Sequence, residues 1–285
     1  MDSTAPRRPR FIDNNDVANT PVLTESQLKV EGRVAVLTLN RDDVRNALTG
    51  TRLVDEICDT LAWANAGSDV SVLILTGAGS AFSAGGNIKT MRERSLASSA
   101  GELEQYYRHS IQRIPRAMEA SEIPLVAAVN GPAIGAGFDL SNMCDIRIGS
   151  SRAQFGETFV NLGLIAGDGG SWFLQRLVGA QRAAELTLTG RVVKADEAKE
   201  LGILLEVTEP ERLLARAGEI AAQIAAKPPL AVRYAKRLLN LARRQSLPDH
   251  LEACASFQGA LQKTEDHLEA LAAFFEKRAG QYRGK

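Results

Sequence analysis

Cysteine and histidine are scarce in this chain of 285 residues, with three of each. The cysteines are odd in number and widely spaced, so they form neither a disulfide framework nor a zinc-ligand pattern. The histidines are scattered as well, and no H-E-x-x-H pair is present to hold a metal on one helix face. The sequence therefore predicts no metal site, and it predicts free thiols at Cys58, Cys144 and Cys254.

Long apolar runs and an excess of charge are also missing. The longest apolar runs, VAVLTL, VLIL and PLVAAV, have the length of strands and fall far short of the roughly 20 residues that span a bilayer. Lys plus Arg number 34 and Asp plus Glu number 34, so no net field favours nucleic acid. The polar first twenty residues contain no apolar signal-peptide core. We expect a cytoplasmic protein with neither membrane nor nucleic-acid partners.

Several catalytic and nucleotide-binding signatures are absent. No G-x-S-x-G segment occurs, which argues against a serine hydrolase of that kind. Two GAG loops, at 77–79 and 135–137, resemble the start of a dinucleotide fingerprint, but Phe82 and Leu140 occupy the places of its last glycine. Neither loop continues with the Lys-Ser/Thr of a P-loop. A nucleotide-binding Rossmann fold is therefore disfavoured.

Hydrophobic periodicity divides the chain into an α/β core and a helical C-terminal region. Strand-like runs at 33–40, 70–76 and 124–129 alternate with helical patterns, which favours largely parallel strands. One helical pattern covers 102–120, where Pro115 predicts a kink. The last part of the chain holds four successive helical stretches. We expect a flexible extension over 1–25, an α/β core over 26–206 and a helical region over 207–285.

Two glycine-rich segments carry the strongest chemical signal, AFSAGGNIK at 81–89 and NGPAIGAGFDLSNMCD at 130–145. Each follows a strand-like run and leads into a helix. Glycines let backbone N–H groups approach a ligand closely, and two such groups converging on one point form an oxyanion hole. An acidic residue, Asp139, follows the second loop within one helical turn. This combination predicts an enzyme that works beside a carbonyl group.

Six ordered segments resemble the crotonase family, that of the enoyl-CoA hydratases and isomerases. They are RNAL, AFSAGGNIK, VNGPAIGAGFDLSNMCDIRI, AQFGETFVNLGLIAGDGG, LTGRVVKADEAKELGI and AFFEKRAGQY, and together they run from about Val30 to the C-terminus. The resemblance implies a crotonase-like spiral of repeated β-β-α units with a C-terminal helical trimerisation region. It also implies a homotrimer or homohexamer, an acyl-CoA substrate, and no cofactor beyond the coenzyme A of that substrate.

The resemblance also assigns the first half of a catalytic site. It places the N–H donors of the oxyanion hole on Gly86 and Ala136. Asp139 matches the first catalytic carboxylate, which is Glu in typical hydratases and Asp in the dienoyl-CoA isomerase branch. A simpler alternative for Asp139 is an acid that only satisfies the dipole at a helix N-terminus.

The second carboxylate is where this chain departs from the family. Typical hydratases read F-G-x-P-E, whereas the chain reads FGETF, so Phe159 replaces the second catalytic glutamate. A phenyl ring cannot transfer a proton, which leaves Glu157 and Asp168 as substitutes. The alternative for Asp168 is an N-cap of a helix over 169–178, and for Glu157 a solvated or salt-bridged surface acid.

A coenzyme A site is implied as well. Its residues match the two segments that hold pantetheine and adenine in the family, and a C-terminal pair matches residues that reach the coenzyme A of a neighbouring subunit. The first group is Arg45, Ala47, Ala84, Asn87, Ile88 and Lys89, and the pair is Phe274 and Lys277. Asn87 stands where the family usually has Asp.

Hydration of a 2-enoyl-CoA, with an enolate stabilised in the oxyanion hole, is the function that this pattern favours. The missing glutamate keeps a second reaction open, the isomerisation of an enoyl- or dienoyl-CoA, since one carboxylate can shuttle a proton between carbons. A third alternative is a non-catalytic protein that binds CoA thioesters. Neither the acyl-chain length nor the pathway is encoded in these motifs.

Overall fold

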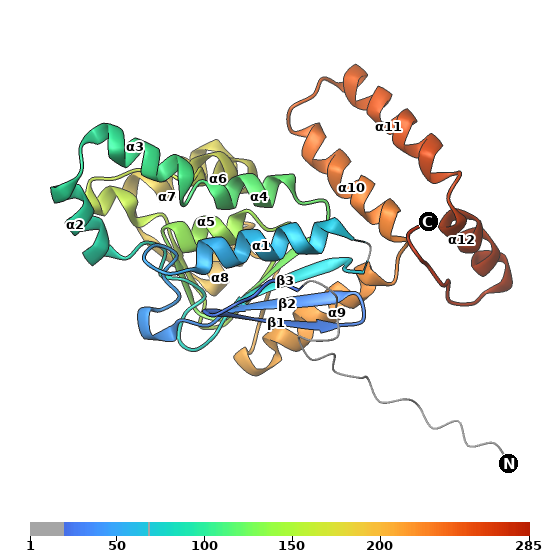
Figure 1. Ribbon diagram of the computed structural model, residues 1–285, viewed down its shortest axis with the longest axis horizontal. Helices are drawn as coiled ribbons and strands as arrows, with labels where there is room; N and C mark the ends of the chain where they lie inside the picture. The colour runs from blue at the N-terminus through green and yellow to red at the C-terminus, as the bar shows by residue number, and fades with distance from the viewer. Residues whose placement is uncertain (1–19, 68) are drawn as a thin grey trace, which may run out of the picture.

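The structure is a computed structural model that describes residues 20–67 and 69–285. Most of the extension expected over 1–25 lies outside the described residues. In Figure 1 a layer of helices lies over a sheet, and the last three helices project away from this body. The division at residue 206 stays a prediction.

The main sheet has six strands, and most of them are parallel. Its order is β1 (Ser26–Glu31), β2 (Val34–Leu39), β3 (Val72–Gly77), β4 (Leu125–Val129), β6 (Ile146–Ser150) and β9 (Glu206–Thr208). Only the β1–β2 pair is antiparallel. The strands expected near 33–40, 70–76 and 124–129 are β2, β3 and β4. All five residues of β4 are buried, as expected for a parallel strand that is covered on both faces.

A smaller sheet completes the spiral. It contains β5 (Pro132–Ile134), β7 (Gln154–Gly156) and β8 (Val192–Lys194), and an isolated bridge joins Ser83 to Ala133. The chain passes three times from the large sheet to the small sheet and then into a helix. These turns end in α2 (Ile88–Ala97), α5 (Ala136–Asn142) and α6 (Gly170–Val178). The repeated β-β-α order confirms the expected crotonase-like α/β fold.

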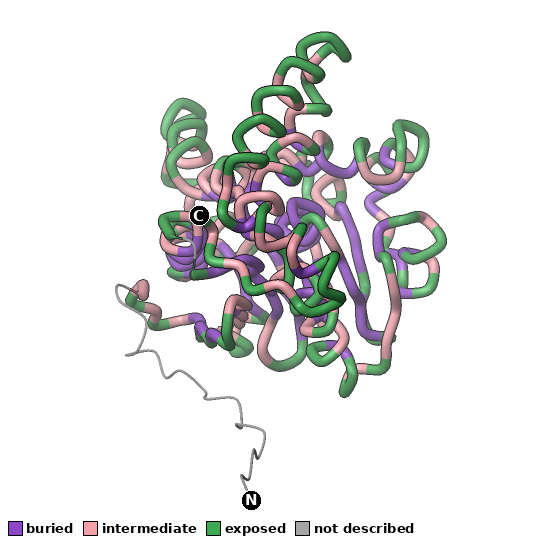
Figure 2. Tube along the Cα trace, turned by 90° about the vertical axis from the view of Figure 1, so that its right-hand side faces the viewer, coloured by how far each residue is buried: buried purple, intermediate pink, exposed green. Residues whose placement is uncertain are grey.

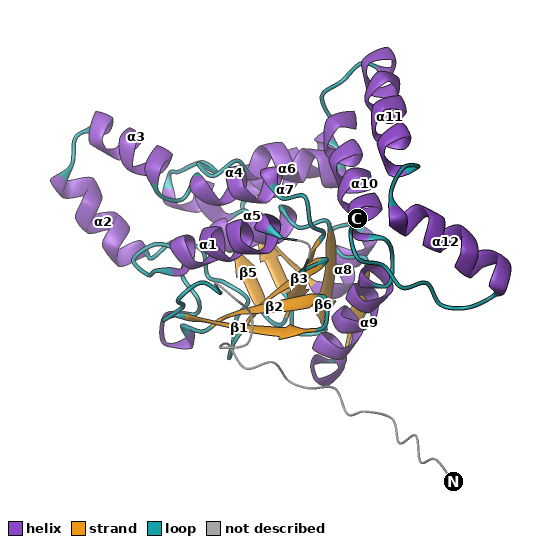
Figure 3. Ribbon diagram, turned by 45° about the vertical axis from the view of Figure 1, so that its right-hand side comes forward, coloured by secondary structure: helices purple, strands orange, loops and turns teal. Residues whose placement is uncertain are grey.

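Helices lie around the main sheet in Figure 3, and Figure 2 shows buried residues inside the molecule with exposed residues on the outer helices. Alternation along β3 sends Val72 and Ile74 to one face and Leu73 and Leu75 to the other. The first pair packs against α9 (Leu213–Ala225). The second pair belongs to a larger cluster under α1 (Leu53–Ala66). This larger cluster holds the helices that position the site.

The segment expected as one kinked helix forms two separate helices. They are α3 (Ala100–His109) and α4 (Arg113–Ala120), and the break lies before Pro115. The predicted kink at Pro115 is therefore wrong. Proline is tolerated in the first turn of a helix, because the N–H it lacks has no intrahelical acceptor there. Pro115 is the third residue of α4, so it helps begin a helix instead of bending one.

Several short elements were not expected from the sequence. These are helices α7 (Ala180–Thr189) and α8 (Ala195–Glu200), and the 3₁₀ helices Asp42–Val44, Thr158–Leu162 and Pro210–Arg212. Of the four helices expected near the C-terminus, the first is α9. The other three are α10 (Pro229–Ala242), α11 (Leu247–Leu261) and α12 (Glu265–Glu276).

Helix α10 is anchored to the core, whereas α11 and α12 present apolar side chains outward. Lys236 Nζ donates to the Ile123 carbonyl at 2.7 Å and pairs with Asp145 at 2.8 Å. On α12, Phe274 is 78% exposed and Phe275 is 77% exposed. Within the described residues, no helix is long and apolar enough to cross a membrane.

Candidate active site

The two glycine-rich loops lie against each other, backbone to backbone. A Cβ on Gly137 would stand 2.1 Å from the Ser83 carbonyl oxygen, and a Cβ on Gly85 would stand 2.4 Å from that of Ile134. Gly85 also has φ of +76°, in the left-handed region that favours glycine. Only glycine therefore allows this approach, which brings the segments around residues 86 and 136 together.

Gly86 and Ala136 line the same inner cavity, whose volume is about 120 Å³. Ala136 is the first residue of α5, so its N–H has no acceptor inside the helix. In the part of the chain that the structure describes, the Gly86 N–H has no hydrogen-bond partner either. Neither N–H group is engaged within the described residues, and an oxyanion hole requires two such unengaged donors.

Three carboxyl groups meet beside this cavity, and we call Asp139, Glu157 and Asp168 the acid cluster. Asp139 lies in the first turn of α5, Glu157 directly follows β7, and Asp168 precedes α6. Asp139 and Glu157 are 0% exposed, and Asp168 is 4% exposed. The charges of Glu157 and Asp168 both act on the Asp139 carboxyl, and neither of its oxygens has a hydrogen-bond partner within the described residues. The structure therefore brings together all three acids that the sequence proposed.

Burial raises the pKa of every member of the acid cluster. For Asp139 the largest cause is desolvation, followed by the negative charges of Asp168 and Glu157, and its pKa rises well above the ordinary value. Desolvation is also the main reason that the pKa values of Glu157 and Asp168 rise. Ionised carboxylates only accept hydrogen bonds, so a hydrogen bond between two members of the cluster would require a proton. Burial and two neighbouring carboxyls oppose the charge of Asp139, so its protonated form is favoured to a higher pH than for an ordinary aspartate.

Only one member of the acid cluster faces the space where a substrate would lie. Asp168 lines the inner cavity together with Gly86 and Ala136. Asp139 and Glu157 are not among the lining residues. Asp168 is thus the member of the acid cluster that a bound molecule could contact, and Asp139 and Glu157 lie outside the lining of this cavity.

The simpler alternatives for Glu157 and Asp168 are wrong. The N-cap of α6 is Gly169, and no side chain caps this helix, so Asp168 is not its N-cap. Glu157 is fully buried, so it is not a surface acid. Asp139 does lie in the first turn of a helix, where a negative charge interacts favourably with the helix dipole. That interaction alone does not require the side chain to be completely buried beside two other acids, as it is here.

Phe159 forms an apolar wall of the inner cavity. It lies in the 3₁₀ helix that follows Glu157, and its ring is 3.5 Å from the place of a Cβ on Gly135. The ring therefore borders the loop that carries the Ala136 N–H. A phenyl group here excludes water without handling protons.

The two segments expected to hold coenzyme A are joined by a backbone hydrogen bond. The Ala84 N–H donates to the Arg45 carbonyl at 2.8 Å, which joins the two segments, and Arg45 itself is exposed. Asn87 caps α2 by accepting from the N–H groups of Lys89 and Thr90. Asn and Asp are both favourable N-cap residues, so the Asn87 side chain can cap α2 at a position where the family usually has Asp.

Phe274 and Lys277 do not join this group within one chain. Phe274 lies on α12 and Lys277 directly follows it. In Figures 1 and 3, α12 and α2 stand at opposite ends of the molecule. A contact of this pair with coenzyme A would thus require a second subunit.

Sequence reasoning missed the residues that cover the cavity from α2 and α3. Tyr107 contributes to its wall, and burial raises the pKa of the Tyr107 hydroxyl, with a further contribution from the Asp168 charge. Arg94 also lines the cavity, with its guanidinium carbon 3.5 Å from the Tyr106 ring centroid. The tyrosine pair within the helical pattern of 102–120 was visible in the sequence, but nothing there related it to Asp168.

No metal centre is formed in the described ranges 20–67 and 69–285. No three His, Cys, Asp or Glu side chains there are arranged to hold an ion.

Gly170 supports the acid cluster from α6. A Cβ at this position would stand 2.1 Å from Oδ1 of Asp139 and 2.4 Å from Oδ2. We expect Gly170→Ala to displace the Asp139 carboxyl and to lower turnover by at least ten-fold while the protein still folds. Gly218→Ala is the matched control, because a Cβ on Gly218 would meet nothing within 4 Å. Steady-state kinetics and circular dichroism of both variants test this; equal turnover would contradict it.

Comparisons with known proteins agree with the geometry. The family model described as enoyl-CoA hydratase/isomerase matches residues 29–285. A short-chain-enoyl-CoA hydratase of Clostridium acetobutylicum is 38% identical over 252 residues, 88% of this chain and 94% of the relative. A crotonyl-CoA hydratase of Syntrophomonas wolfei is 38% identical over 261 residues, 90% of this chain and 97% of the relative. The crystal structure of an enoyl-CoA hydratase from Bacillus anthracis superposes with a TM-score of 0.84 at 35% identity, covering 92% of this chain and 100% of that one.

Proposed function

The chain belongs to the enoyl-CoA hydratase/isomerase family and is an enzyme of that family, and we propose that its own reaction is the addition of water to a 2-enoyl-CoA thioester. One observation carries the proposal. Asp168, the accessible member of the acid cluster, lines the same cavity as the free N–H groups of Gly86 and Ala136. Hydration requires a positioned acid–base group, here Asp168, and hydrogen-bond donors that stabilise negative charge on the thioester oxygen, here the two N–H groups.

The backbone donors act on the carbonyl oxygen of the thioester. As the oxygen of water bonds to the β-carbon, electron density moves to this carbonyl oxygen and an enolate forms. Gly86 and Ala136 donate to the oxygen while the charge develops, and one such donor is typically worth about 3–4 kcal/mol in the transition state. Their N–H groups are fixed by the close contact of the two glycine-rich loops, so little reorganisation is required.

The acid cluster handles the protons. The ionised Asp168 carboxyl removes a proton from the attacking water, and a proton returns from the cluster to the α-carbon of the enolate. One molecule of water is added, and the enzyme recovers its starting protonation state. Asp139 and Glu157 hold and redistribute the shared proton, because both lie behind Asp168 and away from the cavity.

Coenzyme A enters as part of the substrate, and no separate cofactor takes part. The loop residues assigned to its binding hold it on the exposed side of the oxyanion loop, and Phe274 with Lys277 reach it from a neighbouring subunit in a trimer or hexamer. The exposed apolar side chains of α11 and α12 support such an assembly. The described cysteines are unpaired, which fits a reducing cytoplasm.

Crotonyl-CoA is the first substrate to test. We expect the purified protein to consume it, with loss of the absorbance of the conjugated thioester and formation of 3-hydroxybutyryl-CoA. Saturated butyryl-CoA is the control and should give no change. Binding of crotonyl-CoA without turnover of any enoyl or dienoyl ester would instead identify a non-catalytic thioester-binding protein.

Double-bond isomerisation is the second candidate, favoured by Phe159 at the place of the second catalytic glutamate. A single accessible carboxylate, Asp168, could remove a proton from one carbon and return it to another. A 3-enoyl-CoA then gains conjugation, so its absorbance rises, whereas hydration of a 2-enoyl-CoA makes absorbance fall. Measuring both substrates with one preparation separates the two reactions.

A further inference from the structure

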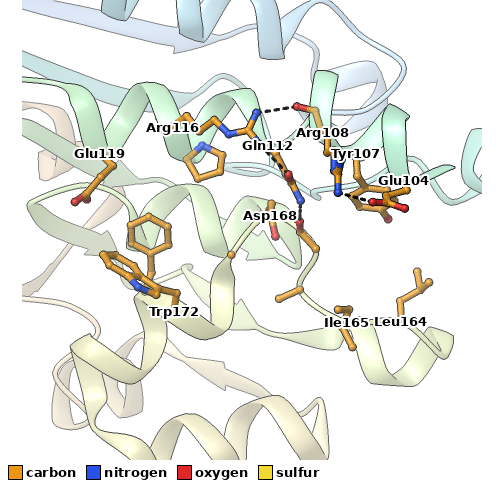
Figure 4. Close-up of a pocket in the computed structure, with 15 residues that line it drawn as sticks. Glu104, Tyr107, Arg108, Gln112, Arg116, Glu119, Leu164, Ile165, Asp168 and Trp172 are labelled. Carbon is orange, nitrogen blue, oxygen red and sulfur yellow. Dashed lines mark hydrogen bonds and ion pairs between the residues drawn. The ribbon is translucent and has the colours of Figure 1, made fainter. Parts of the chain in front are cut away.

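The two sides of the proposed active site are held in different ways. Figure 4 shows the side of the acid cluster, where Gln112 Nε2 donates to the Gly167 carbonyl at 2.8 Å and so supports the loop that enters α6. On the other side, the loop 83–87 is bonded to the segment 45–49. The proposed reaction requires the Gly86 N–H of this loop to point at the thioester oxygen, so the contacts that fix its direction matter for turnover.

A backbone hydrogen bond sets the plane of the peptide that carries this N–H. The Leu48 N–H donates to the Gly85 carbonyl at 2.6 Å. A trans peptide is planar, so the Gly85 carbonyl and the Gly86 N–H point in opposite directions. Because the carbonyl is turned toward the segment 45–49, the Gly86 N–H points away from that segment, and Gly86 lines the inner cavity.

Thr49 holds the next peptide along the chain. Its Oγ1 accepts from the Asn87 N–H at 2.8 Å, and this bond opposes rotation of the peptide between Gly86 and Asn87. Thr49 lines the inner cavity as well, and a Cβ on Gly86 would stand 3.7 Å from its Oγ1. The hydroxyl therefore lies beside the Gly86 backbone and is bonded to the neighbouring N–H.

Ser83 holds the preceding peptide. Its side chain is fully buried, and its Oγ accepts from the Gly85 N–H at 3.2 Å and donates to the Asn46 carbonyl at 2.7 Å. The Ser83 carbonyl accepts from the Ile134 N–H at 3.0 Å, in the second glycine-rich loop. Ser83 thus ties the first loop both to the segment 45–49 and to the loop that carries the second donor.

The glycines make this external support important. Gly85 and Gly86 have no Cβ, so their backbone angles are less restricted than those of other residues. Two such residues in succession do not hold a peptide N–H in one direction by themselves. An oxyanion hole is effective because its donors are oriented before charge develops on the substrate. The hydroxyls that fix the neighbouring peptides therefore contribute to the rate.

We propose that Thr49 and Ser83 are positioning residues of the oxyanion hole, whose hydroxyls fix the peptides on both sides of the one that carries the Gly86 N–H. This inference rests on the proposed function, since it concerns the same site. It gives the segment 45–49 a role in orienting a catalytic donor, besides the coenzyme A contacts assigned to two of its residues.

A pair of substitutions at Thr49 tests the proposal by kinetics. Thr49→Val removes the hydroxyl at nearly constant shape, and Thr49→Ser keeps it. With crotonyl-CoA, we expect Thr49→Val to lower kcat by about ten- to a hundred-fold and to change KM by less than about three-fold, because a misdirected donor acts chiefly on the transition state. Thr49→Ser should stay within about three-fold of the parent in both constants.

Thr60→Val is the matched control. Thr60 is buried too, but its hydroxyl donates to the Glu56 carbonyl at 2.7 Å within α1, outside the loop 83–87. Its kcat should stay within about two-fold of the parent. A parent-like kcat for Thr49→Val, with the parent hydrating crotonyl-CoA, would overturn this inference and leave the proposed function intact.

The carbonyl stretching frequency of bound butyryl-CoA separates positioning from a merely structural role. This saturated thioester cannot add water, and a carbon-13 label at its carbonyl isolates the band in an infrared difference spectrum. Well-directed hydrogen bonds weaken the C=O bond and lower its frequency. We expect a smaller lowering in Thr49→Val and Ser83→Ala than in the parent, and the parent value in Thr49→Ser and Thr60→Val.

The alternatives give different results. Lower thermal stability with parent-like kcat and carbonyl frequency would mean that the hydroxyls only hold the fold, and it would overturn the proposal. A raised KM with an unchanged frequency would mean that Thr49 contacts the substrate directly, and it would overturn the proposal as well. If the parent hydrates no enoyl ester, the proposed function is rejected, whereas the carbonyl frequencies still decide the positioning role because they require only binding. If Ser83→Ala does not fold, the Thr49 variants decide alone.

Discussion

Asp168→Asn should lower turnover of an enoyl-CoA substrate by about 10²–10⁴, the usual value of a positioned acid–base group. The amide keeps nearly the same shape but cannot remove a proton from water. Asp168 is the only member of the acid cluster that lines the inner cavity of the described structure, so the buried acids have no direct route to the substrate. We expect KM to change little, because Asp168 contributes a small part of the binding surface.

Glu157→Gln is the matched comparison for this variant. Glu157 belongs to the same cluster but is fully buried and does not line the cavity. Its loss should therefore lower turnover less than the loss of Asp168, by roughly ten-fold. The pH dependence separates the roles further: Asp168→Asn should remove the dependence of kcat/KM on a basic group, and Glu157→Gln should only shift it. If Glu157→Gln costs more than Asp168→Asn, the two assignments must be exchanged.

The core of the fold was predictable because its strands carry their own signal. The buried runs of β3 and β4 alternate with helical patterns, and this order predicts parallel strands without tertiary information. In the smaller sheet the sequence indicated a strand near 153–155, which is β7, but it did not indicate β5 or β8, because three residues carry little periodicity. The break before Pro115 was misplaced for a related reason. Proline disfavours a helix interior, but a sequence alone does not tell whether the helix begins just before it.

The sequence named the three acids that the structure brings together, but it did not predict how they are arranged. Glycine spacing and Asp139 pointed to a carbonyl-directed enzyme, and the departure at Phe159 left Glu157 and Asp168 as substitutes. Which of them faces the substrate depends on how α5, α6 and the 3₁₀ helix pack, which no local pattern specifies. The contribution of Tyr107 depends on the same packing. Tyr107 and Asp168, for example, are about sixty residues apart in the sequence.

The acid cluster makes the stability of the folded protein depend on pH. Its pKa values are raised in the folded protein, chiefly by desolvation, so folding takes up protons relative to the unfolded chain. The stabilising contribution of the protonated groups is complete below their unfolded pKa values, near 4. It is lost as pH rises through the higher pKa values of the folded state, so the free energy of unfolding falls as pH increases across this window.

Asp139→Asn should therefore have opposite effects on stability and on turnover. The amide can donate hydrogen bonds to both neighbouring carboxylates without requiring a proton, so we expect the melting temperature at pH 7 to rise. For a chain of this size, 1 kcal/mol corresponds to about 2–4 °C. The decline in stability as pH rises above the unfolded pKa values, near 4, should also become shallower than in the parent protein. Turnover should fall by about 10²–10⁴, because the shared proton can no longer pass through this position.

Thermal melts at several pH values, together with steady-state kinetics, measure both effects on one preparation. Asp196→Asn is the control, since Asp196 lies in the first turn of α8, outside the acid cluster, and its replacement leaves the buried carboxyls unchanged. A variant that loses turnover and stability together would mean that Asp139 chiefly holds the fold. A variant that gains stability and keeps full turnover would remove Asp139 from the proton path. Gain of stability with loss of turnover is the combination expected of a buried acid kept for its chemistry, because an amide of the same shape satisfies the structure better but cannot pass a proton.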